Sequence, residues 1–329
     1  MRVVITGGAG FIGSNLVHYW TRQHPDDAVT VIDALTYAGR RESLADLTGR
    51  RGFELRVADI ADANAMRDAV RGTDLLLNLA AETHNDRAIA DPLPFAKTNV
   101  LGTMVLLEAC RKADVRRVHH VSTDEVYGSL ALDDPSRFTE STPYHPRGPY
   151  SASKAASDHL VRAWHETYGL ATTISNCGNN FGPYQHPEKL IPLAITHLIR
   201  GERVPIYGDG KNVRDWIYVE DHCSALDVIA HRGVPGETYL VSAENELSNR
   251  ELVTKLAGLF GKGSEVLQSV ADRPGHDRRY ALDPTKLRTQ LDWQPRFRFD
   301  EALERTARWY RENPSWWAPM VSASERQPP

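Results

Sequence analysis

Tyr150 and Lys154 are the residues whose types and spacing most directly suggest chemistry. They enclose the segment YSASK, and a separation of four places them on one face of a helix, one turn apart. A tyrosine with an ordinary pKa of about 10 is a poor base near neutral pH, and a nearby ammonium favours its phenolate. Beside a nicotinamide cofactor, such a phenolate could take a proton from a sugar hydroxyl while hydride leaves the same carbon. Most tyrosine–lysine pairs at this spacing are ordinary helix surface, so the interpretation depends on the other motifs.

The elements that must position this pair alternate between strand and helix. Sequence patterns predict strands at 2–6, 28–33, 53–57, 74–79, 117–122 and 171–176, and helices at about 11–23, 63–70, 94–113 and 149–168. Such alternation is typical of an α/β fold with a doubly wound parallel sheet and right-handed crossovers. After Gly178 the pattern loosens into short strands, many prolines and helices near 190–200, 219–232, 249–259 and 300–312.

We therefore expect two domains. Residues 1–178 would form a Rossmann-type nucleotide-binding domain, to which a segment near 209–231 returns. Residues 179–329 would mainly form a smaller mixed α/β lobe that binds substrate, laid across the C-terminal edge of the sheet, where ligands of such folds bind.

A glycine-rich turn lies directly between the first predicted strand and the first predicted helix. Gly7, Gly10 and Gly13 would permit a tight turn and close approach of the backbone to a pyrophosphate, while the helix N-terminus supplies amides and a positive dipole. Asp33 closes the second strand and is placed to accept hydrogen bonds from the adenosine ribose hydroxyls. Because an acid there repels a 2′-phosphate, NAD is favoured over NADP.

Two later segments fit the same cofactor. Asp59 and Ile60 follow the third strand and would flank the adenine, although a helix N-cap is an equally good interpretation of Asp59. Leu79, Ala80 and Ala81 end the fourth strand and have the small side chains needed where a backbone runs beneath the ribose and nicotinamide.

An acidic pair follows the fifth strand. Thr123, Asp124 and Glu125 stand in the segment STDEVYG, at the sheet edge where chemistry belongs in this architecture. Such a pair often only begins a helix, but its place after a buried strand favours a catalytic role. Two adjacent carboxyl groups in a dry site can separate their pKa values, which gives one acid and one base.

From Gly7 to about Tyr280 the chain resembles the extended short-chain dehydrogenase/reductases and, among them, the dTDP-glucose 4,6-dehydratase family. The glycine turn and YxxxK are shared across that superfamily, whereas TDEVYG, the run NNFGPYQHPEKLIP and DRPGHD are more specific to the dehydratases. Some positions depart from the family pattern: Asn85 stands where an apolar residue is usual, and Gly178 where serine is common.

The resemblance implies a hydro-lyase that makes dTDP-4-keto-6-deoxyglucose from dTDP-glucose in deoxysugar biosynthesis. Tyr150 would take the 4-hydroxyl proton, with Thr123 bonded to the same oxygen and Lys154 stabilising the phenolate. Hydride would pass from C4 to NAD. Glu125 would then take the C5 proton, and Asp124, kept protonated, would donate to the departing 6-hydroxyl before hydride returns to C6.

The resemblance also implies binding residues. Cofactor-binding residues would be Gly7, Gly10, Phe11, Ile12, Gly13, Asp33, Leu35, Thr36, Asp59, Ile60, Leu79, Ala80, Ala81, Thr98, Tyr150, Lys154 and Asn180. Substrate-binding residues would be Thr83, His84, Thr123, Glu125, Asn179, Lys189, Leu190, Pro205, Tyr207, Arg214, Asn249, Arg273 and His276. Among these, the cations Lys189, Arg214 and Arg273 suit a diphosphate.

Three alternatives stay open. A sugar-nucleotide 4-epimerase would keep the glycines and YxxxK but needs no acidic pair at 124–125. A GDP-mannose 4,6-dehydratase would keep a glutamate but is expected to prefer NADP, against which Asp33 argues. A non-catalytic NAD sensor would not require Thr123, Tyr150 and Lys154.

Composition excludes other classes of function. The 329 residues carry a net charge of −4, which gives no general attraction to nucleic acid, and no apolar run approaches the roughly 20 residues that span a membrane. Three cysteines without CxxC spacing and the lack of a signal peptide suit the cytoplasm. The histidine spacing predicts no metal site.

Self-association is also expected. The helices near 94–113 and 149–168 resemble those that form a four-helix interface in this superfamily, which implies a symmetric homodimer. The contact residues would be Leu101, Met104, Val105, Glu108, Leu160, Val161 and Trp164.

Overall fold

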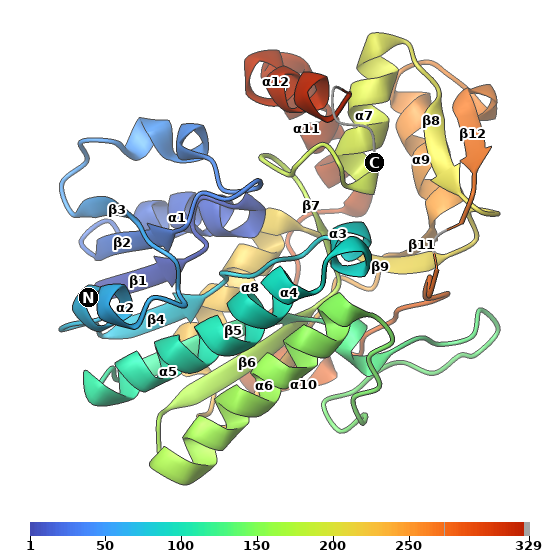
Figure 1. The fold of residues 1–329 in the computed structure, drawn as a ribbon. Coiled ribbons are helices and arrows are strands. Elements are labelled where there is room, and N and C mark those ends of the chain that lie inside the picture. The colour runs from blue at the N-terminus through green and yellow to red at the C-terminus, as the bar shows by residue number, and fades with distance from the viewer. Residues whose placement is uncertain (273, 326–329) are drawn as a thin grey trace.

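A parallel sheet of seven strands forms the centre of the protein, whose computed structural model describes residues 1–272 and 274–325 (Figure 1). The strand order is β10-β6-β5-β4-β1-β2-β3, so the predicted doubly wound parallel sheet is confirmed. The order changes direction between β1 and β4, and ligands of such folds bind at that point. The strands are β1 (Arg2–Thr6), β2 (Ala28–Asp33), β3 (Phe53–Val57), β4 (Leu75–Asn78), β5 (Arg117–Thr123), β6 (Thr172–Cys177) and β10 (Thr238–Val241).

Helices cover both faces of this sheet. Successive side chains of a strand point to opposite faces. Accordingly, Val3 and Ile5 of β1 pack with Leu16 of α1 in one core, whereas Val4 packs with Leu106 of α5 in another. The first core adjoins α1 (Phe11–Gln23) and α8 (Val219–Arg232), and the second adjoins α2 (Ala63–Ala69), α5 (Thr103–Lys112) and α6 (Pro149–Tyr168). Helices on both sides explain why the strands read as continuous apolar runs.

The helix expected at 94–113 is divided. α4 (Leu93–Phe95) leads into a π-helical segment, η2 (Ala96–Gly102), before α5 begins. Asn99 in this wider segment donates to Ser153 Oγ (2.8 Å) and accepts from the amide of Glu82 (2.9 Å). Such segments often mark functional sites, and this one ties α6 to the chain that follows β4.

Most of the remaining elements form the part of the molecule beyond the sheet's C-terminal edge, whereas α10 packs on β10 of the large sheet and η1 lies against α1 (Figure 1). The strands beyond the edge form a sheet of order β11-β9-β7 and a parallel pair, β12 and β8. These strands are β7 (Asn179–Phe181), β8 (Val204–Tyr207), β9 (Val213–Tyr218), β11 (Glu246–Ser248) and β12 (Leu267–Val270). The further helices are α3 (Asn85–Ala90), α7 (Leu190–Arg200), α9 (Asn249–Leu259), α10 (Thr285–Leu291), α11 (Phe299–Glu312) and α12 (Pro314–Glu325). Short 3₁₀ segments are η1 (Arg41–Leu47), η3 (Asp124–Tyr127) and η4 (Ser264–Val266).

The chain returns to the large sheet through α8 and β10, which pairs with β6. β9 falls within the segment 209–231 that was expected to return, but it lies in the small sheet. The domain division at residue 178 stays a prediction. Among the described helices, none is long and apolar enough to cross a membrane.

Candidate active site

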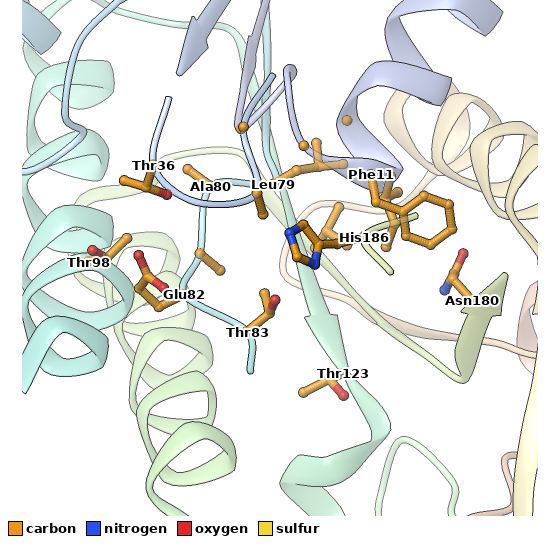
Figure 2. A pocket seen from close by; sticks show the side chains of 18 of the residues that line it. Phe11, Thr36, Leu79, Ala80, Glu82, Thr83, Thr98, Thr123, Asn180 and His186 are labelled. Carbon is orange, nitrogen blue, oxygen red and sulfur yellow. The ribbon is translucent and has the colours of Figure 1, made fainter. Parts of the chain in front are cut away.

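A cleft of about 1620 Å³, including the space at its open mouth, lies over the C-terminal ends of β1, β4 and β5 (Figure 2). All five predicted catalytic side chains line it: Thr123, Asp124, Glu125, Tyr150 and Lys154. The following residues predicted to bind cofactor also line it: Gly7, Gly10, Phe11, Ile12, Gly13, Asp33, Thr36, Asp59, Ile60, Leu79, Ala80, Ala81, Thr98 and Asn180. The fold therefore brings residues from nearly every predicted motif to one place.

The glycine turn is shaped by backbone contact. Gly7 has φ +67°, and a Cβ there would lie 2.7 Å from the amide nitrogen of Ala80, so only glycine fits. The end of β1 thus lies directly against the end of β4. Gly10 caps α1 without any side-chain hydrogen bond, which leaves the first amides of this helix to an anion.

Asp33 joins the end of β2 to the glycine turn. Its carboxylate accepts hydrogen bonds from the amides of Ala9 (2.9 Å) and Leu35 (2.8 Å). Burial raises the pKa of Asp33, while these amides oppose the rise. Leu35, which was predicted to bind the cofactor, donates its backbone amide to Asp33 and has φ +51°, but the residue does not line the cleft.

Asp59 lines the cleft beside the end of β3. Its carboxylate accepts from the amide of Ala61 (2.9 Å) and from Lys97 Nζ (2.9 Å). The N-cap of α2 is Asp62, whose side chain accepts from the amides of two residues in the first turn. The alternative interpretation of Asp59 as a helix cap is therefore wrong.

The acidic pair begins η3, directly after β5. Thr123 Oγ1 accepts from the amide of Glu125 (3.3 Å) and donates to Asp124 Oδ1 (3.2 Å). Asp124 is buried, and its Oδ2 has no hydrogen-bond partner within the described residues. Burial, followed by the charge of Glu125, raises the pKa of Asp124 well above its usual value. A neutral acid with an unbonded oxygen is suited to donate a proton.

Tyr150 and Lys154 are both buried on α6. Burial raises the pKa of Tyr150 well above its usual value, and the Thr123 hydroxyl opposes the rise. Burial also lowers the pKa of Lys154, whose Nζ donates to the carbonyl of Val121 (2.8 Å). Burial therefore dominates at Tyr150, and Lys154 is not among the groups that act most strongly on its phenol.

The predicted substrate residues are spread more widely. Thr83, Asn179 and Lys189 line the cleft, and Lys189 Nζ donates to the carbonyl of Thr83 (3.2 Å). The cleft lining leaves out His84, Leu190, Pro205, Tyr207, Arg214, Asn249 and His276. Arg273 lies outside the described residues.

Three of the more distant residues have specific surroundings. Arg214 is buried and donates to the carbonyls of Val213 (2.8 Å) and Asp277 (2.9 Å). The rings of Tyr207 and His276 meet edge to face, with centroids 6.2 Å apart. Tyr207 at the end of β8 and His276 therefore form a ring pair outside the cleft lining, whereas the charge of Arg214 on β9 still acts on Asp124.

Sequence reasoning missed a cluster that also lines the cleft. Tyr37, His186 and Glu188 all belong to it. The guanidinium of Arg87 lies 3.9 Å from the centroid of the Tyr37 ring, and its Nε lies 3.6 Å from Glu188 Oε2. Tyr37 stands four residues after Asp33, and Glu188 stands inside the run NNFGPYQHPEKLIP, which was the available signal. The cluster connects the loop after β2 to the loop before α7.

One group of described side chains could hold a metal ion, where the histidine spacing predicted none. It consists of His24, Asp227 and His231 at the ends of α1 and α8. The Asp227 carboxylate lies 3.0 Å from His24 Nε2 and 2.8 Å from His231 Nδ1. None of the three lines the cleft.

The fold and the site define a nucleotide-binding protein of the short-chain dehydrogenase/reductase type. Residues 4–306 match the family model described as GDP-mannose 4,6 dehydratase, and the chain belongs to this family. The dTDP-glucose 4,6-dehydratase of Mycobacterium tuberculosis is 54% identical over 326 residues, which cover 99% of this chain and 98% of that protein. The dTDP-glucose 4,6-dehydratase 1 of Escherichia coli is 47% identical over 96% of this chain and 94% of its own.

Solved structures agree. DesIV, a dTDP-glucose 4,6-dehydratase from Streptomyces venezuelae crystallised with NAD and TYD, has a TM-score of 0.95 and 48% identity, covering 97% of this chain and 100% of that one. The UDP-glucose 4-epimerase of Thermus thermophilus has a TM-score of 0.87 and 30% identity, covering 95% of this chain and 100% of that one. The resemblance to the dTDP-glucose 4,6-dehydratases that the motifs indicated is confirmed.

Proposed function

We propose that this protein is an NAD-dependent hydro-lyase that converts dTDP-glucose to dTDP-4-keto-6-deoxyglucose for deoxysugar biosynthesis. The observation that carries the proposal is that the acidic pair, buried Asp124 and partly buried Glu125, lines the same cleft as Tyr150 and Lys154. A 4-epimerase needs Tyr150 and Lys154 but no acidic pair, because it removes no water. The relatives with this activity match nearly the whole chain.

NAD is the proposed cofactor. The uncapped N-terminus of α1 suits the pyrophosphate, and the Asp33 carboxylate suits an unphosphorylated adenosine ribose. When bound, NAD accepts hydride from C4 and later returns it to C6. Because no net turnover of cofactor occurs, we expect purified protein to retain NAD, and mass analysis of the released dinucleotide tests this. Activity that requires NADP would contradict the argument from Asp33.

Oxidation at C4 is the proposed first step. Tyr150 is proposed to accept the proton of the 4-hydroxyl. Because burial raises its pKa, this step requires the positive charge of a bound nicotinamide to favour the phenolate, and the Thr123 hydroxyl acts in the same direction. Lys154 is held by the carbonyl of Val121 and is proposed to orient the nicotinamide ribose. Burial of all three excludes water from the reacting atoms.

Elimination of water follows. The new C4 ketone makes the C5 proton acidic, and Glu125 removes that proton. Burial, followed by the charge of Glu125, raises the pKa of Asp124 and so favours its protonated form, which can donate to the departing 6-hydroxyl. The hydroxyl leaves as water, so the two neighbouring carboxyl groups perform opposite proton transfers. When hydride returns to C6, the proton held by Glu125 would return to C5, which completes the product and restores the carboxylate.

We propose that the nucleotide part of the substrate extends from Lys189 toward β8. Lys189 suits a phosphate, whereas Tyr207 and His276 offer ring surfaces for the base. Arg214 is bonded to two carbonyls, and its guanidinium lies 4.3 Å from the centroid of the Tyr280 ring. We therefore assign Arg214 to shaping this region.

A homodimer is proposed through α5 and α6, which lie side by side on one face (Figure 1). Leu101 (43%) at the end of η2 and Met104 (38%) at the start of α5 are exposed. Val161 is fully buried in the core, so the expectation that it contacts a partner is wrong. Glu108 is paired with Arg111 within its own helix.

The three described cysteines are buried and free, which supports the proposed cytoplasmic location.

The test is incubation with dTDP-glucose and NAD, followed by mass spectrometry. The expected product is lighter than the substrate by one water molecule. A product of unchanged mass with an inverted C4 hydroxyl would contradict the proposal in favour of a 4-epimerase.

A further inference from the structure

A buried charged group lies behind Lys154, outside the cleft lining. Asp158 stands one turn further along α6 and is 0% exposed. His120 of β5 lies between the two, with Nε2 3.3 Å from Lys154 Nζ and 3.4 Å from Asp158 Oδ1. Neither His120 nor Asp158 has a part in the steps proposed above.

The Asp158 carboxylate is built into the core as an anion. Its Oδ2 accepts hydrogen bonds from Ser122 (2.9 Å), Tyr144 (2.8 Å) and Asn176 (3.2 Å). Burial acts to raise the pKa of Asp158, but its contact with His120, the charge of Lys154 and the hydrogen bond from Ser122 leave the pKa below the usual value. An ionised carboxylate without water costs several kcal/mol unless it is paired, so a nearby cation is expected.

His120 does not supply that cation. Burial, followed by the charge of Lys154, lowers the pKa of His120 to about 4, so the imidazole is neutral near neutral pH. It is held from its other side by Asn78, whose Nδ2 lies 3.0 Å from His120 Nδ1. The ring is therefore a fixed neutral spacer between a buried ammonium and a buried carboxylate.

The groups that face the two charges come from α6 and from the strands packed on it. Asp158 and the Cys177 thiol act on Lys154, and burial raises the pKa of that thiol to about 12, so it is neutral. Tyr127, Tyr144 and Arg162 act near Asp158, and burial raises the pKa of both phenols. Asp158 is thus the anion near Lys154 that favours its charged form.

We infer that Asp158, acting across His120, is a positioning residue for the proposed reaction: its buried charge keeps Lys154 an ammonium and holds it at the carbonyl of Val121. This inference rests on the proposed function, in which that ammonium serves C4 oxidation. Asp158 touches neither the cleft nor the reacting atoms, so its effect passes through Lys154.

The inference has a definite sign. Burial already lowers the pKa of Lys154, and Asp158 opposes that change. Removing the carboxylate charge should lower the pKa of Lys154 further. The ammonium, and with it C4 oxidation, should then be lost at lower pH. Opposite charges at short range shift a pKa by about one unit or more. The alkaline limb of the pH–rate profile should therefore shift to lower pH by about that amount.

Asp158→Asn tests this, because it removes the charge and keeps the shape. Both this variant and its parent should carry Glu125→Gln, which blocks elimination so that NADH formed from dTDP-glucose accumulates. NADH formation in a single turnover is then followed across pH. We expect the alkaline limb of Asp158→Asn to lie about one pH unit below that of the parent. Asp221→Asn is the control, since Asp221 is a buried carboxylate bonded only to backbone amides of Arg296 and Phe297 among the described contacts.

The outcomes separate the two proposals. No NADH from the Glu125→Gln parent at any pH contradicts the proposed function itself. If the parent forms NADH and Asp158→Asn forms it more slowly by the same factor at every pH, the pH dependence is unchanged and the positioning role is overturned. If Asp158→Asn does not fold, Asp158→Ser leaves room for water at the three donors and is measured in the same way. Failure of both variants to fold would mark the carboxylate as purely structural and would also overturn the inference.

Discussion

The side-chain amide of Asn85 donates a hydrogen bond to Glu125 Oε2 at 3.0 Å. This contact joins the first residue of α3 to the carboxylate that we propose removes the C5 proton. Hydrogen bonds to charged groups contribute about 1.5–3 kcal/mol, which is enough to restrict the orientation of the carboxylate. Asn85 is also one of the positions where this chain departs from the family pattern, so the support for the base is a property of this chain.

Replacing Asn85 with valine should therefore slow C5 deprotonation and leave C4 oxidation unchanged. We expect about a tenfold loss, the lower end of that energy range expressed as a rate. Incorporation of solvent deuterium at C5 measures C5 deprotonation, and the rise of NADH measures C4 oxidation. Asn85→Gln keeps an amide donor and should recover part of the exchange rate. Equal exchange in Asn85→Val and wild type would show that the bond is incidental.

Tyr150 and Glu125 should fail at different steps. Tyr150→Phe removes the proton acceptor for C4 oxidation, so no NADH should appear with substrate. Glu125→Gln should oxidise C4, accumulate NADH and a 4-keto-glucose intermediate, and show little deuterium exchange at C5. Loss of such an acid or base costs on the order of 10²–10⁴-fold in rate. If Glu125→Gln dehydrates at the wild-type rate while Tyr150→Phe is inactive, the carboxylates are structural.

Asp124 should limit stability as pH rises. Burial raises its folded-state pKa above the ordinary value, so its contribution to stability is complete below the ordinary pKa and declines as pH climbs toward the raised value. Asp124→Asn removes this decline. We therefore expect the variant to melt higher than wild type at neutral pH by roughly 2–4 °C, with a gap that widens from acidic to alkaline buffer.

Thermal unfolding at several pH values measures the gap, and the same variant should eliminate water slowly. A melting temperature below that of wild type by a margin that grows with pH would show that Asp124 is ionised in the folded protein.

Local signals predicted the elements, whereas long-range contacts decided the details of the site. Helix α6 begins at Pro149 and ends before Gly169, as predicted, because both residues mark helix ends in the sequence itself. The contact between His120 and Lys154 depends on how β5 packs against α6, which no local pattern reports. Arg214 was expected at the diphosphate, yet nearby backbone carbonyls receive its hydrogen bonds.

The division of the helix at 94–113 has the same origin. Its apolar spacing alone predicts one continuous helix. The π-helical segment contains Asn99, whose bonds reach Ser153 on α6 and Glu82 after β4. Those partners are set by the tertiary fold, so the segment could not be found from its own residues.

The exposed apolar residues Leu101 of η2 and Met104 of α5 should decide the oligomeric state. Near the axis of a symmetric dimer, Leu101→Arg would bring two like charges together and remove them from water, since each subunit contributes the same surface. We expect wild type to scatter light as a dimer and Leu101→Arg as a 36.8 kDa monomer at micromolar concentration.

Leu132→Arg is the matched control for this change. Leu132 is 42% exposed against 43% for Leu101, and it lies outside η2, α5 and α6, so the same substitution there should leave the dimer intact. Dissociation by both variants would mean that added positive charge, and not this face, controls assembly. A wild-type protein that is itself 36.8 kDa in solution would remove the proposed interface, and the exposure of Leu101 and Met104 would then need another explanation.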